Sequence, residues 1–247
     1  REDGTTPYRL GDQDLSLFFG QSSFSQYVVT RASNAVVVDP EVDLSLLGRV
    51  GCGIQTGSGT VVNLLIPVVG ESLVVFGCGA VGLSAIMAAK LTGCSQIIAV
   101  DIHASRLALA GELGATHQIN GKEQDAVAVI KQITGKGAHY AVETTGVSAI
   151  VLQAVHAVKP LGTVAIVGFT GDITLNVQND LMAEGKSLVG VIEGDAVPAL
   201  FIPLLVQLYK QGKFPIDKLI ARYPLADINQ AFADSASGKV IKPVVVM

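Results

Sequence analysis

The chain has 247 residues, of which 49% are hydrophobic and 15% charged, and its formal net charge is −4. This composition supplies enough apolar material for one large domain or two smaller ones. No cluster of lysine and arginine suggests a nucleic-acid or lipid surface, and the longest apolar runs, at 61–69 and 199–206, are well short of a membrane span. We therefore expect neither nucleic-acid nor membrane partners.

Cysteine and histidine usage gives no framework of disulfides or metal ligands. The three cysteines, Cys52, Cys78 and Cys94, are too few and too scattered for a disulfide scaffold, which indicates a reducing compartment. The four histidines lie far apart without metal-ligand spacing, and the first residues do not read as a signal peptide. We therefore expect a cytoplasmic protein.

The first predicted elements lie at 15–39, where a polar turn separates two strand-like runs and no helix alternates with them. This pattern is typical of part of a mainly β unit. From residue 72 onward, β-branched runs instead alternate with glycine-containing turns and segments rich in alanine and leucine, which is the signature of βαβ units.

This alternating part predicts an α/β fold. Strands are expected at 73–76, 96–100, 117–119, 139–143, 162–167 and 187–192. Helices are expected at 80–91, 105–113, 124–134 and 148–158. Six parallel strands with crossover helices make a complete doubly wound sheet. After it come predicted helices at 197–210 and 226–234, a short run at 219–223 and a final strand at 243–247, and we expect the two ends of the chain to pack on one second domain.

The turn after the first strand of the sheet carries Gly77, Gly79 and Gly82 in the spacing G-x-G-x-x-G. The first glycine permits a tight turn, the second lets a diphosphate approach the backbone, and the third lets helix and strand pack closely. The helix that follows directs its positive end at the phosphates. The other loop residues assigned to this site are Cys78, Ala80 and Val81. By itself the motif is weak, because glycine-rich turns that bind nothing are common.

Asp101 ends the next predicted strand, 19 residues after Gly82. A carboxylate there can accept hydrogen bonds from the adenosine ribose and would repel a 2′-phosphate, which favours NAD over NADP. One alternative is an aspartate that only caps the next helix, and another is a methyltransferase, which also binds an adenosyl ligand at such a turn. A methyltransferase has no diphosphate to bring close to the loop, so we expect a dinucleotide site.

Several longer segments resemble the zinc-dependent medium-chain alcohol dehydrogenases. The likeness runs from about Phe18 to Met247 and includes FFGQSSFSQYVVTRASNAVVVD, LGRVGCGIQTGSGTV, VVFGCGAVGLSAIMAAKLTGC, IIAVDIHASRLALAGELGATHQIN and GKVIKPVVV. FFGQSSF and GCGIQTG together resemble the aryl-alcohol branch, the benzyl alcohol dehydrogenases. The resemblance implies a Rossmann NAD-binding domain at 53–192, the remnant of a mainly β, GroES-like catalytic domain at 1–52, and a segment at 193–247 that returns to that domain.

The resemblance also implies roles for single residues. Cys52 matches a ligand of the catalytic zinc and Thr56 a position beside the nicotinamide; read alone, they are more often a buried thiol and a residue hydrogen-bonded at a helix start. Arg106 matches a basic residue near the adenosine ribose and Lys242 one that reaches the phosphates, although either could be a solvated charge. The positions implied to lie along the cofactor are Thr145, Val167, Gly168 and Val191.

The activity implied by the resemblance is hydride transfer from a primary, aromatic alcohol to NAD, with zinc as Lewis acid, in a homodimer or homotetramer. The family's other two zinc ligands, a cysteine and a histidine in a Gly-His-Glu context, have no counterpart in the sequence, and one thiolate cannot hold a catalytic zinc. We therefore expect the C-terminal part of a longer enzyme, able to bind NAD but poor at turnover by itself. Aliphatic alcohols or a glutathione adduct as substrate, and a non-catalytic NAD-binding module, remain alternatives.

Overall fold

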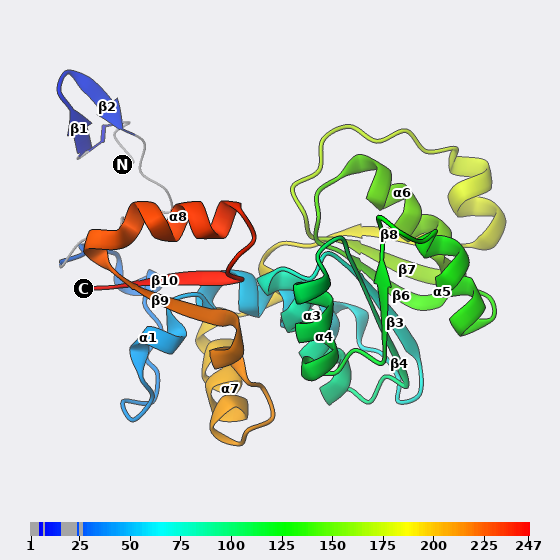
Figure 1. Ribbon diagram of the computed structural model, residues 1–247, viewed down its shortest axis with the longest axis horizontal. Coiled ribbons are helices and arrows are strands. Elements are labelled where there is room, and N and C mark those ends of the chain that lie inside the picture. Colours follow the sequence, from blue (N-terminus) through cyan, green and yellow to red (C-terminus); the bar gives the residue numbers. More distant parts are fainter. Residues whose placement is uncertain (1–4, 7, 16–23, 25–26) are drawn as a thin grey trace.

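The computed structural model describes residues 5–6, 8–15, 24 and 27–247. Its largest feature is a six-stranded parallel sheet with the order β5-β4-β3-β6-β7-β8 (Figure 1). The strands are β3 (Ser72–Phe76), β4 (Gln96–Asp101), β5 (His117–Asn120), β6 (Ala138–Glu143), β7 (Val158–Ile166) and β8 (Ser187–Gly190). The order reverses between β3 and β6, so their carboxyl ends flank a topological switch point. The predicted doubly wound α/β fold is confirmed.

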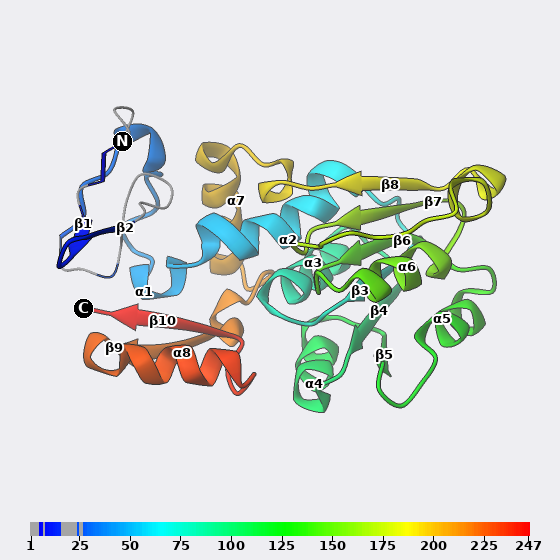
Figure 2. The same cartoon turned by 90° about the horizontal axis from the view of Figure 1, so that it is seen from above.

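Helices cover both faces of this sheet (Figure 2). α3 (Ala80–Leu91) and α4 (Ala104–Leu113) share one hydrophobic cluster with the sheet. α5 (Ala126–Thr134) and α6 (Ser148–Ala157) share a second cluster with it. The predicted bounds of α3 agree with the structure at both ends, because a glycine turn precedes the helix and its apolar residues recur at helical spacing.

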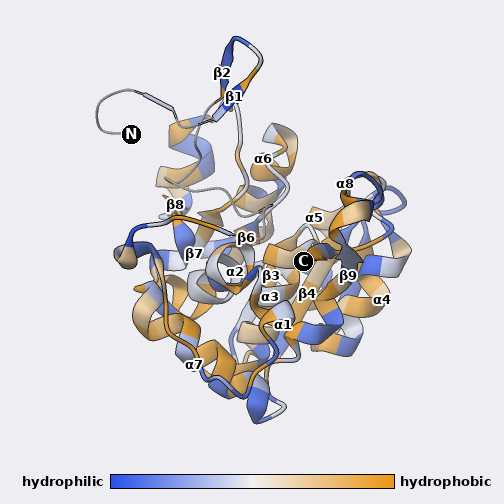
Figure 3. Cartoon of the chain, turned by 90° about the vertical axis from the view of Figure 1, so that its left-hand side faces the viewer, coloured by the Kyte–Doolittle hydropathy of each residue, from blue (hydrophilic) through white to orange (hydrophobic). Residues whose placement is uncertain are grey.

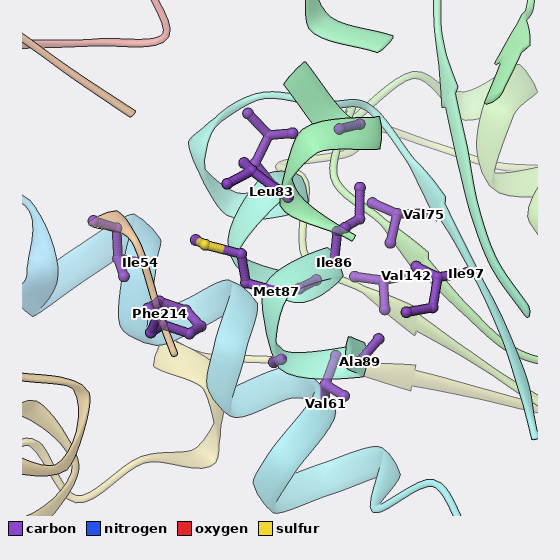
Figure 4. Packing of buried hydrophobic residues seen from close by; sticks show 14 of the residues in the cluster. Ile54, Val61, Val75, Leu83, Ile86, Met87, Ala89, Ile97, Val142 and Phe214 are labelled. Carbon is purple, nitrogen blue, oxygen red and sulfur yellow. The ribbon is translucent and has the colours of Figure 1, made fainter. Parts of the chain in front are cut away.

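Alternate residues of β3 divide between the two clusters. Leu73 and Val75 point to the face covered by α3, and Val74 and Phe76 to the opposite face. Side chains alternate along a strand, so a strand covered by helices on both faces is apolar throughout. Figure 4 shows Val75 beside Ile86 of α3 within the first cluster.

A helical stretch precedes β3 and packs on α3. It runs through η2 (Val50–Ile54), α2 (Gln55–Gly59) and η3 (Thr60–Leu65), the first and last with π-type turns. Its apolar residues Ile54 and Val61 lie in the same cluster as Met87 and Phe214 (Figure 4). The predicted domain boundary between residues 52 and 53 falls inside this stretch, and the division into domains stays a prediction.

The C-terminal part forms a small βαβ unit. It contains α7 (Pro198–Lys210), η7 (Ile216–Leu219), β9 (Ile220–Pro224), η8 (Leu225–Asp227), α8 (Ile228–Ala236) and β10 (Lys242–Val246), and β9 pairs with β10 in parallel. Lys210 forms ion pairs with Asp39 (2.5 Å) and Glu41 (3.0 Å), and Arg222 pairs with Asp43 (2.7 Å). The segment before α1 (Leu44–Leu47) therefore lies against the C-terminal part.

After Leu15, the strands predicted at 15–39 are not found in the described part of that segment. Residues 16–23 and 25–26 lie outside the described residues, while 27–39 contains only the short η1 (Ala32–Asn34). Val29 and Val37 are each 92% exposed. A strand needs a neighbour to take its backbone hydrogen bonds, and no described segment supplies one here. Upstream, β1 (Tyr8–Leu10) and β2 (Gln13–Leu15) form an exposed antiparallel hairpin.

Two strand ends differ from the prediction for local reasons. β7 begins at Val158 instead of residue 162, and its pairing with β6 is shifted after the first residue pair. β8 ends at Gly190 instead of residue 192, because the chain then turns into η6 (Glu193–Asp195). Between β7 and β8 lie η4 (Val177–Leu181) and η5 (Met182–Glu184). Among the described residues, every helix is too short or too polar to cross a membrane.

The amino ends of the central strands β3 and β6 hold a partly buried histidine, His139. The backbone N–H of Ser72 donates to Nδ1 of His139 (3.2 Å), and the Ser72 hydroxyl lies 2.8 Å from the same atom. Burial lowers the pKa of His139, the charge of Lys159 lowers it further, and Glu71 opposes both. The folded chain therefore favours a neutral imidazole that accepts the Ser72 N–H.

This arrangement predicts that acid destabilises the fold through His139. Because its folded pKa lies below the unfolded value, the unfolded chain binds more protons once the pH falls below about 6.5. The free energy of unfolding should drop between pH 7.5 and 5.5, by at most about 1.4 kcal/mol per pH unit for one proton. Urea unfolding of His139→Asn, which keeps an acceptor for Ser72, should show a flatter dependence over this range, and an unchanged slope would contradict the prediction.

Candidate functional site

The three glycines of the loop after β3 have three different surroundings. Gly77 has φ +91°, and a Cβ there would lie 2.6 Å from Oγ1 of Thr144. A Cβ on Gly82 would lie 1.8 Å from the Gly77 carbonyl oxygen, so helix and loop pack too closely for any side chain. A Cβ on Gly79 would meet nothing within 4 Å. The middle glycine therefore leaves the backbone open to a ligand, while the other two serve the fold.

The start of α3 offers N–H groups at this opening. Gly79 is the N-cap, and no side chain caps the helix. The first N–H groups of a helix lack partners within it, and an uncapped N-terminus attracts anions. Ala80 and Val81, the first two residues of α3, line the same cavity as Gly79. This corner can therefore bind a phosphate group.

Asp101, at the end of β4, ties the loop to the neighbouring strand. Its carboxylate accepts hydrogen bonds from the backbone N–H groups of Cys78 (2.7 Å), Ile102 (2.7 Å) and His103 (2.8 Å). Its side chain is buried, yet the residue lines the cavity. A carboxylate has about four acceptor positions, so these bonds leave capacity for a ligand hydroxyl. Asp101 thus orients the glycine loop as well as facing the cavity.

The cavity occupies about 560 Å³ at the carboxyl ends of the central strands. Eight of the predicted residues line it: Gly77, Gly79, Ala80, Val81, Asp101, Arg106, Thr145 and Lys242. Clefts at a switch point are where parallel α/β sheets bind ligands. The residues that the sequence assigned to the diphosphate and ribose half of a dinucleotide are therefore brought together.

Two cations face this cavity. Nε of Arg106 is buried and has no hydrogen-bond partner among the described residues. Burial lowers the pKa of Lys242, and the charge of Arg49 lowers it further, while Cys52 opposes the shift. A buried donor without a partner costs about 1–3 kcal/mol. An anionic, hydroxyl-rich ligand would offset both costs, so the donor set suits phosphate and ribose.

A buried carboxylate fixes the β6 side of the cavity. Glu143 is fully buried and accepts hydrogen bonds from the N–H groups of Thr145 (2.7 Å) and Gly146 (3.3 Å) and from the Thr145 hydroxyl. Thr144, which also lines the cavity, donates its hydroxyl to the Phe76 and Gly77 carbonyls (2.9 and 3.0 Å). The turn after β6 is therefore held rigidly against the glycine loop.

Cys52 and Thr56 lie on the helical stretch beside the cavity, without lining it. A Cβ on Gly53 would lie 3.4 Å from the Val81 side chain, and one on Gly57 would lie 1.9 Å from the Val81 carbonyl oxygen. The turn from Cys52 to Thr56 therefore packs in direct contact with the start of α3. Cys52 is exposed, and its charge raises the pKa of Lys242, which lines the cavity.

The other predicted residues lie outside the cavity lining. Val167 and Gly168 follow β7 and donate their N–H groups to the Glu143 carbonyl (2.9 and 3.1 Å), and Val191 follows β8. Gly82 is buried behind the loop. Cys78 is buried as well, and burial raises the pKa of its thiol, so only its backbone takes part. Their cofactor roles stay predictions.

Several lining residues escaped the sequence analysis. Ile102, His103 and Thr144 directly follow β4 or β6, so the rule that ligands bind at carboxyl strand ends could have found them. Val147 and Gln153 come from the segment before α6 and from α6 itself. No sequence signal separates these two positions from ordinary helix surface.

The described residues do not complete a metal site. No group of three or more histidine, cysteine, aspartate or glutamate side chains lies close enough together, within the described ranges, to hold an ion. Cys52, Cys78 and Cys94 are free thiols. A catalytic zinc takes three protein ligands, so Cys52 can be at most one of a set.

A family profile described as zinc-binding dehydrogenase matches residues 80–210, which is more than half of the chain. The chain belongs to the zinc-binding dehydrogenase family. The two predicted cofactors, NAD and zinc, agree with this membership. The matched region begins at the first residue of α3 and ends at the last residue of α7.

Individual members of this zinc-binding dehydrogenase family are similar over most of the chain. Geraniol dehydrogenase of Castellaniella defragrans is 43% identical over 237 residues, which cover 94% of this chain and 63% of that protein. A zinc-binding domain alcohol dehydrogenase protein from Burkholderia ambifaria has a TM-score of 0.90 at 51% identity and covers 93% of this chain and 63% of its own. Benzyl alcohol dehydrogenase from Acinetobacter calcoaceticus also has 0.90, at 50% identity, with 92% and 64% covered.

These similarities confirm the predicted resemblance to the aryl-alcohol branch of the zinc-dependent medium-chain alcohol dehydrogenases. The chain spans somewhat less than two thirds of the length of each of these three relatives.

Proposed function

We propose that the cavity binds NAD and that the chain is the NAD-binding part of an alcohol dehydrogenase. The observation that carries the proposal is one cavity lined by an open glycine, an uncapped helix start, a strand-end carboxylate and two cations. In this assignment the loop from Gly77 to Gly82 binds the diphosphate, and Asp101 the adenosine ribose. Arg106 and Lys242 offset the negative charge of the phosphates.

The same carboxylate supports NAD over NADP. Asp101 is buried and is already held by three backbone N–H groups, so it cannot easily turn away from a ligand. A 2′-phosphate beside it would place two negative charges in a weakly solvated corner. The positive charge of Arg106 would partly offset this repulsion. We expect it to reduce the preference for NAD over NADP without reversing that preference.

Cys52 is proposed as one ligand of a catalytic zinc. When bound, zinc supplies a Lewis acid that lowers the pKa of an alcohol. The described residues provide the Cys52 sulfur as a ligand but no complete ligand set. The contribution of this chain is then to bind and orient NAD, with Thr56 and Val167 beside the nicotinamide.

The proposed substrate is a primary alcohol whose carbinol carbon is attached to an aromatic ring or a double bond. Two relatives are named for benzyl alcohol and for geraniol, and both compounds share this feature. Geraniol has no aromatic ring, so an aliphatic alcohol is the main alternative to an aromatic alcohol as the substrate. A non-catalytic NAD-binding module is the alternative from another class.

We also infer that two copies associate through β8. This strand is the last in the sheet, so one of its edges is unpaired among the described residues. Shortly after it in the chain, Ile192 is 82% exposed, and Leu200 of α7 is 73% exposed. Figure 3 shows the hydrophobic colouring of α7. An open strand edge beside apolar side chains is a surface that another copy can cover.

The proposal is tested by binding and by turnover. We expect the 247-residue chain to bind NADH, observed as enhanced nicotinamide fluorescence, and to bind NADPH at least about tenfold more weakly. By itself it should form no NADH from NAD and alcohol, even with added zinc. An enzyme completed by the missing zinc ligands should prefer benzyl alcohol or geraniol to ethanol in kcat/KM.

The possible results bear separately on the cofactor, the substrate and the enzymatic role. Absence of NADH binding by folded chain would contradict the cofactor assignment. A preference for ethanol would contradict the substrate class, and a preference for geraniol over benzyl alcohol would contradict the aromatic assignment. Binding of NADH by an intact protein that oxidises no alcohol would support the non-catalytic module.

A further inference from the structure

The turn after β8 has an unusual backbone. Glu193, Gly194 and Asp195 have φ values of +50°, +69° and +49°. Residues other than glycine are rare in this left-handed region, and a run of them persists only where surrounding contacts hold it. The turn is therefore held in place by its neighbours.

Those neighbours are side chains of the helical stretch that carries Cys52. Oε2 of Glu193 accepts hydrogen bonds from Nε2 of Gln55 (2.9 Å) and from the hydroxyl of Thr56 (3.4 Å). Gln55 and Thr56 are both buried. None of the ion pairs among the described residues includes Glu193. Its carboxylate is therefore directed at these two residues.

The orientation of the Gln55 amide follows from this carboxylate. Oε1 of Gln55 is buried and has no hydrogen-bond partner among the described residues, while Nε2 donates to Glu193 and, more weakly, to the Gly51 carbonyl (3.4 Å). A buried amide oxygen without a partner does not hold its own position. The contact on the nitrogen side sets the rotamer.

The backbones of the turn and the helical stretch also touch. A Cβ on Gly59 would lie 2.4 Å from the Gly194 carbonyl oxygen, and one on Gly194 would lie 2.7 Å from the carbonyl oxygens of Gln55 and Thr56. Nδ2 of Asn63 donates to the Gly194 carbonyl (3.0 Å). On its other side, the stretch packs through Gly57 against Val81, which lines the cavity. The stretch is thus fixed between the turn and the start of α3.

We propose that Glu193 is a positioning residue for the nicotinamide half of the cofactor. It acts through Thr56, whose hydroxyl it orients, and through Gln55, which fixes the helical turn after Cys52. The inference rests on the proposed NAD site, with Thr56 beside the nicotinamide. A displacement of about 1 Å at such a turn is enough to disturb the geometry of a bound reactive group.

The chain provides a matched control for this role. Glu193→Gly and Asp195→Gly each remove one acidic side chain from a left-handed position, so both relieve backbone strain and change the net charge equally. Of these two residues, Glu193 alone contacts Gln55 and Thr56 through the described side-chain hydrogen bonds. Because glycine suits this backbone, neither variant is expected to unfold the chain.

The experiment compares two ligands on the full chain. NADH, followed by its fluorescence, reports the nicotinamide end, and ADP-ribose, followed by calorimetry, occupies only the diphosphate and ribose half. We expect Glu193→Gly to weaken NADH about tenfold, the loss of one hydrogen-bonded contact to a charged group, and to leave ADP-ribose within about twofold. Asp195→Gly should leave both affinities unchanged. Glu193→Gln, which keeps an acceptor oxygen, should restore most of the NADH affinity and its fluorescence enhancement.

Several results would overturn the inference. Equal effects of Glu193→Gly and Asp195→Gly on NADH would mean that strain or charge, and not the contacts, matters. Equal weakening of NADH and ADP-ribose by Glu193→Gly would indicate general loosening of the fold. Binding of ADP-ribose by the wild-type chain with no extra affinity for NADH would remove the role of Glu193 while leaving the nucleotide site. Failure of the wild type to bind either ligand would instead refute the proposed function and the inference with it.

Discussion

Alanine at Gly82 is expected to destabilise the chain by about 3 kcal/mol, because a methyl group there cannot be accommodated without moving the backbone. Its Cβ would lie 1.8 Å from the Gly77 carbonyl oxygen and 3.0 Å from a methyl carbon of Val75. Val75 is fully buried in the central strand, and the backbone of Gly77 is held by a hydrogen bond from its N–H to the Val100 carbonyl (2.8 Å). Relief therefore requires α3 to shift away from the sheet.

Alanine at Gly79 makes the matched control in the same loop. Its φ of −78° and ψ of −171° suit any residue, and its Cβ would meet nothing within 4 Å. The stability of Gly79→Ala should therefore stay within about 0.5 kcal/mol of the wild type. The methyl group would occupy the space where the diphosphate approaches, so NADH should bind about tenfold more weakly.

Urea unfolding and NADH titration of both variants separate the two roles. Gly82→Ala should lower the free energy of unfolding without placing a methyl group in the ligand's path. Gly79→Ala should weaken NADH binding and leave the free energy of unfolding nearly unchanged. If Gly79→Ala bound NADH as well as the wild type does, the diphosphate would not lie against this loop. If Gly82→Ala were as stable as the wild type, the close packing of α3 on the loop would be wrong.

Asparagine at Asp101 is expected to weaken NADH binding about 100-fold, since it removes charge-assisted hydrogen bonds to the ligand and to the loop. One oxygen of Asp101 accepts the N–H groups of Ile102 and His103, and an asparagine oxygen can replace it. The other oxygen accepts the N–H of Cys78. In asparagine an NH₂ group would stand there, so two hydrogen-bond donors would face each other. The glycine loop would lose its hydrogen bond to the side chain at the end of β4.

The same variant should reduce the discrimination against NADPH, because the repulsion of the 2′-phosphate disappears. We expect NADPH affinity to fall less than NADH affinity, or to rise. Asp217→Asn, an equal change of charge at an exposed residue of η7, should alter neither ligand. Calorimetric titration of both dinucleotides decides the matter: equal losses for NADH and NADPH would contradict the proposed contact between Asp101 and the ribose.

The central sheet could be predicted closely because its signals are local. The apolar run of β3, the glycine turn and the alanine-rich α3 follow one another without interruption, and the predicted strands of the sheet start and end within a few residues of those observed. The failure at 27–39 has the opposite origin. Valine-rich sequence gives a segment the propensity for a strand, but pairing depends on a neighbour that the segment itself does not encode.

For the site, local spacing and family resemblance found the diphosphate and ribose end, where Gly79, Asp101, Arg106 and Lys242 line one cavity. They did not find Thr144, Val147 or Gln153, which reach the cavity only because β6 and α6 lie beside β3. They also gave no hint of Glu193, which is 137 residues from Thr56 along the chain.

The sequence by itself determined the alternation of strands and helices, the glycine loop and the carboxylate one strand later, because each of these depends on residues close together in the chain. Only the tertiary structure decided that Asp101 holds the loop through Cys78 and that Glu193 contacts the turn after Cys52. It also decided that the buried Nε of Arg106 has no hydrogen-bond partner in the described part of the chain. Hydrogen bonds and burial join residues that the fold brings together, and their partners are defined only once the sheet has assembled.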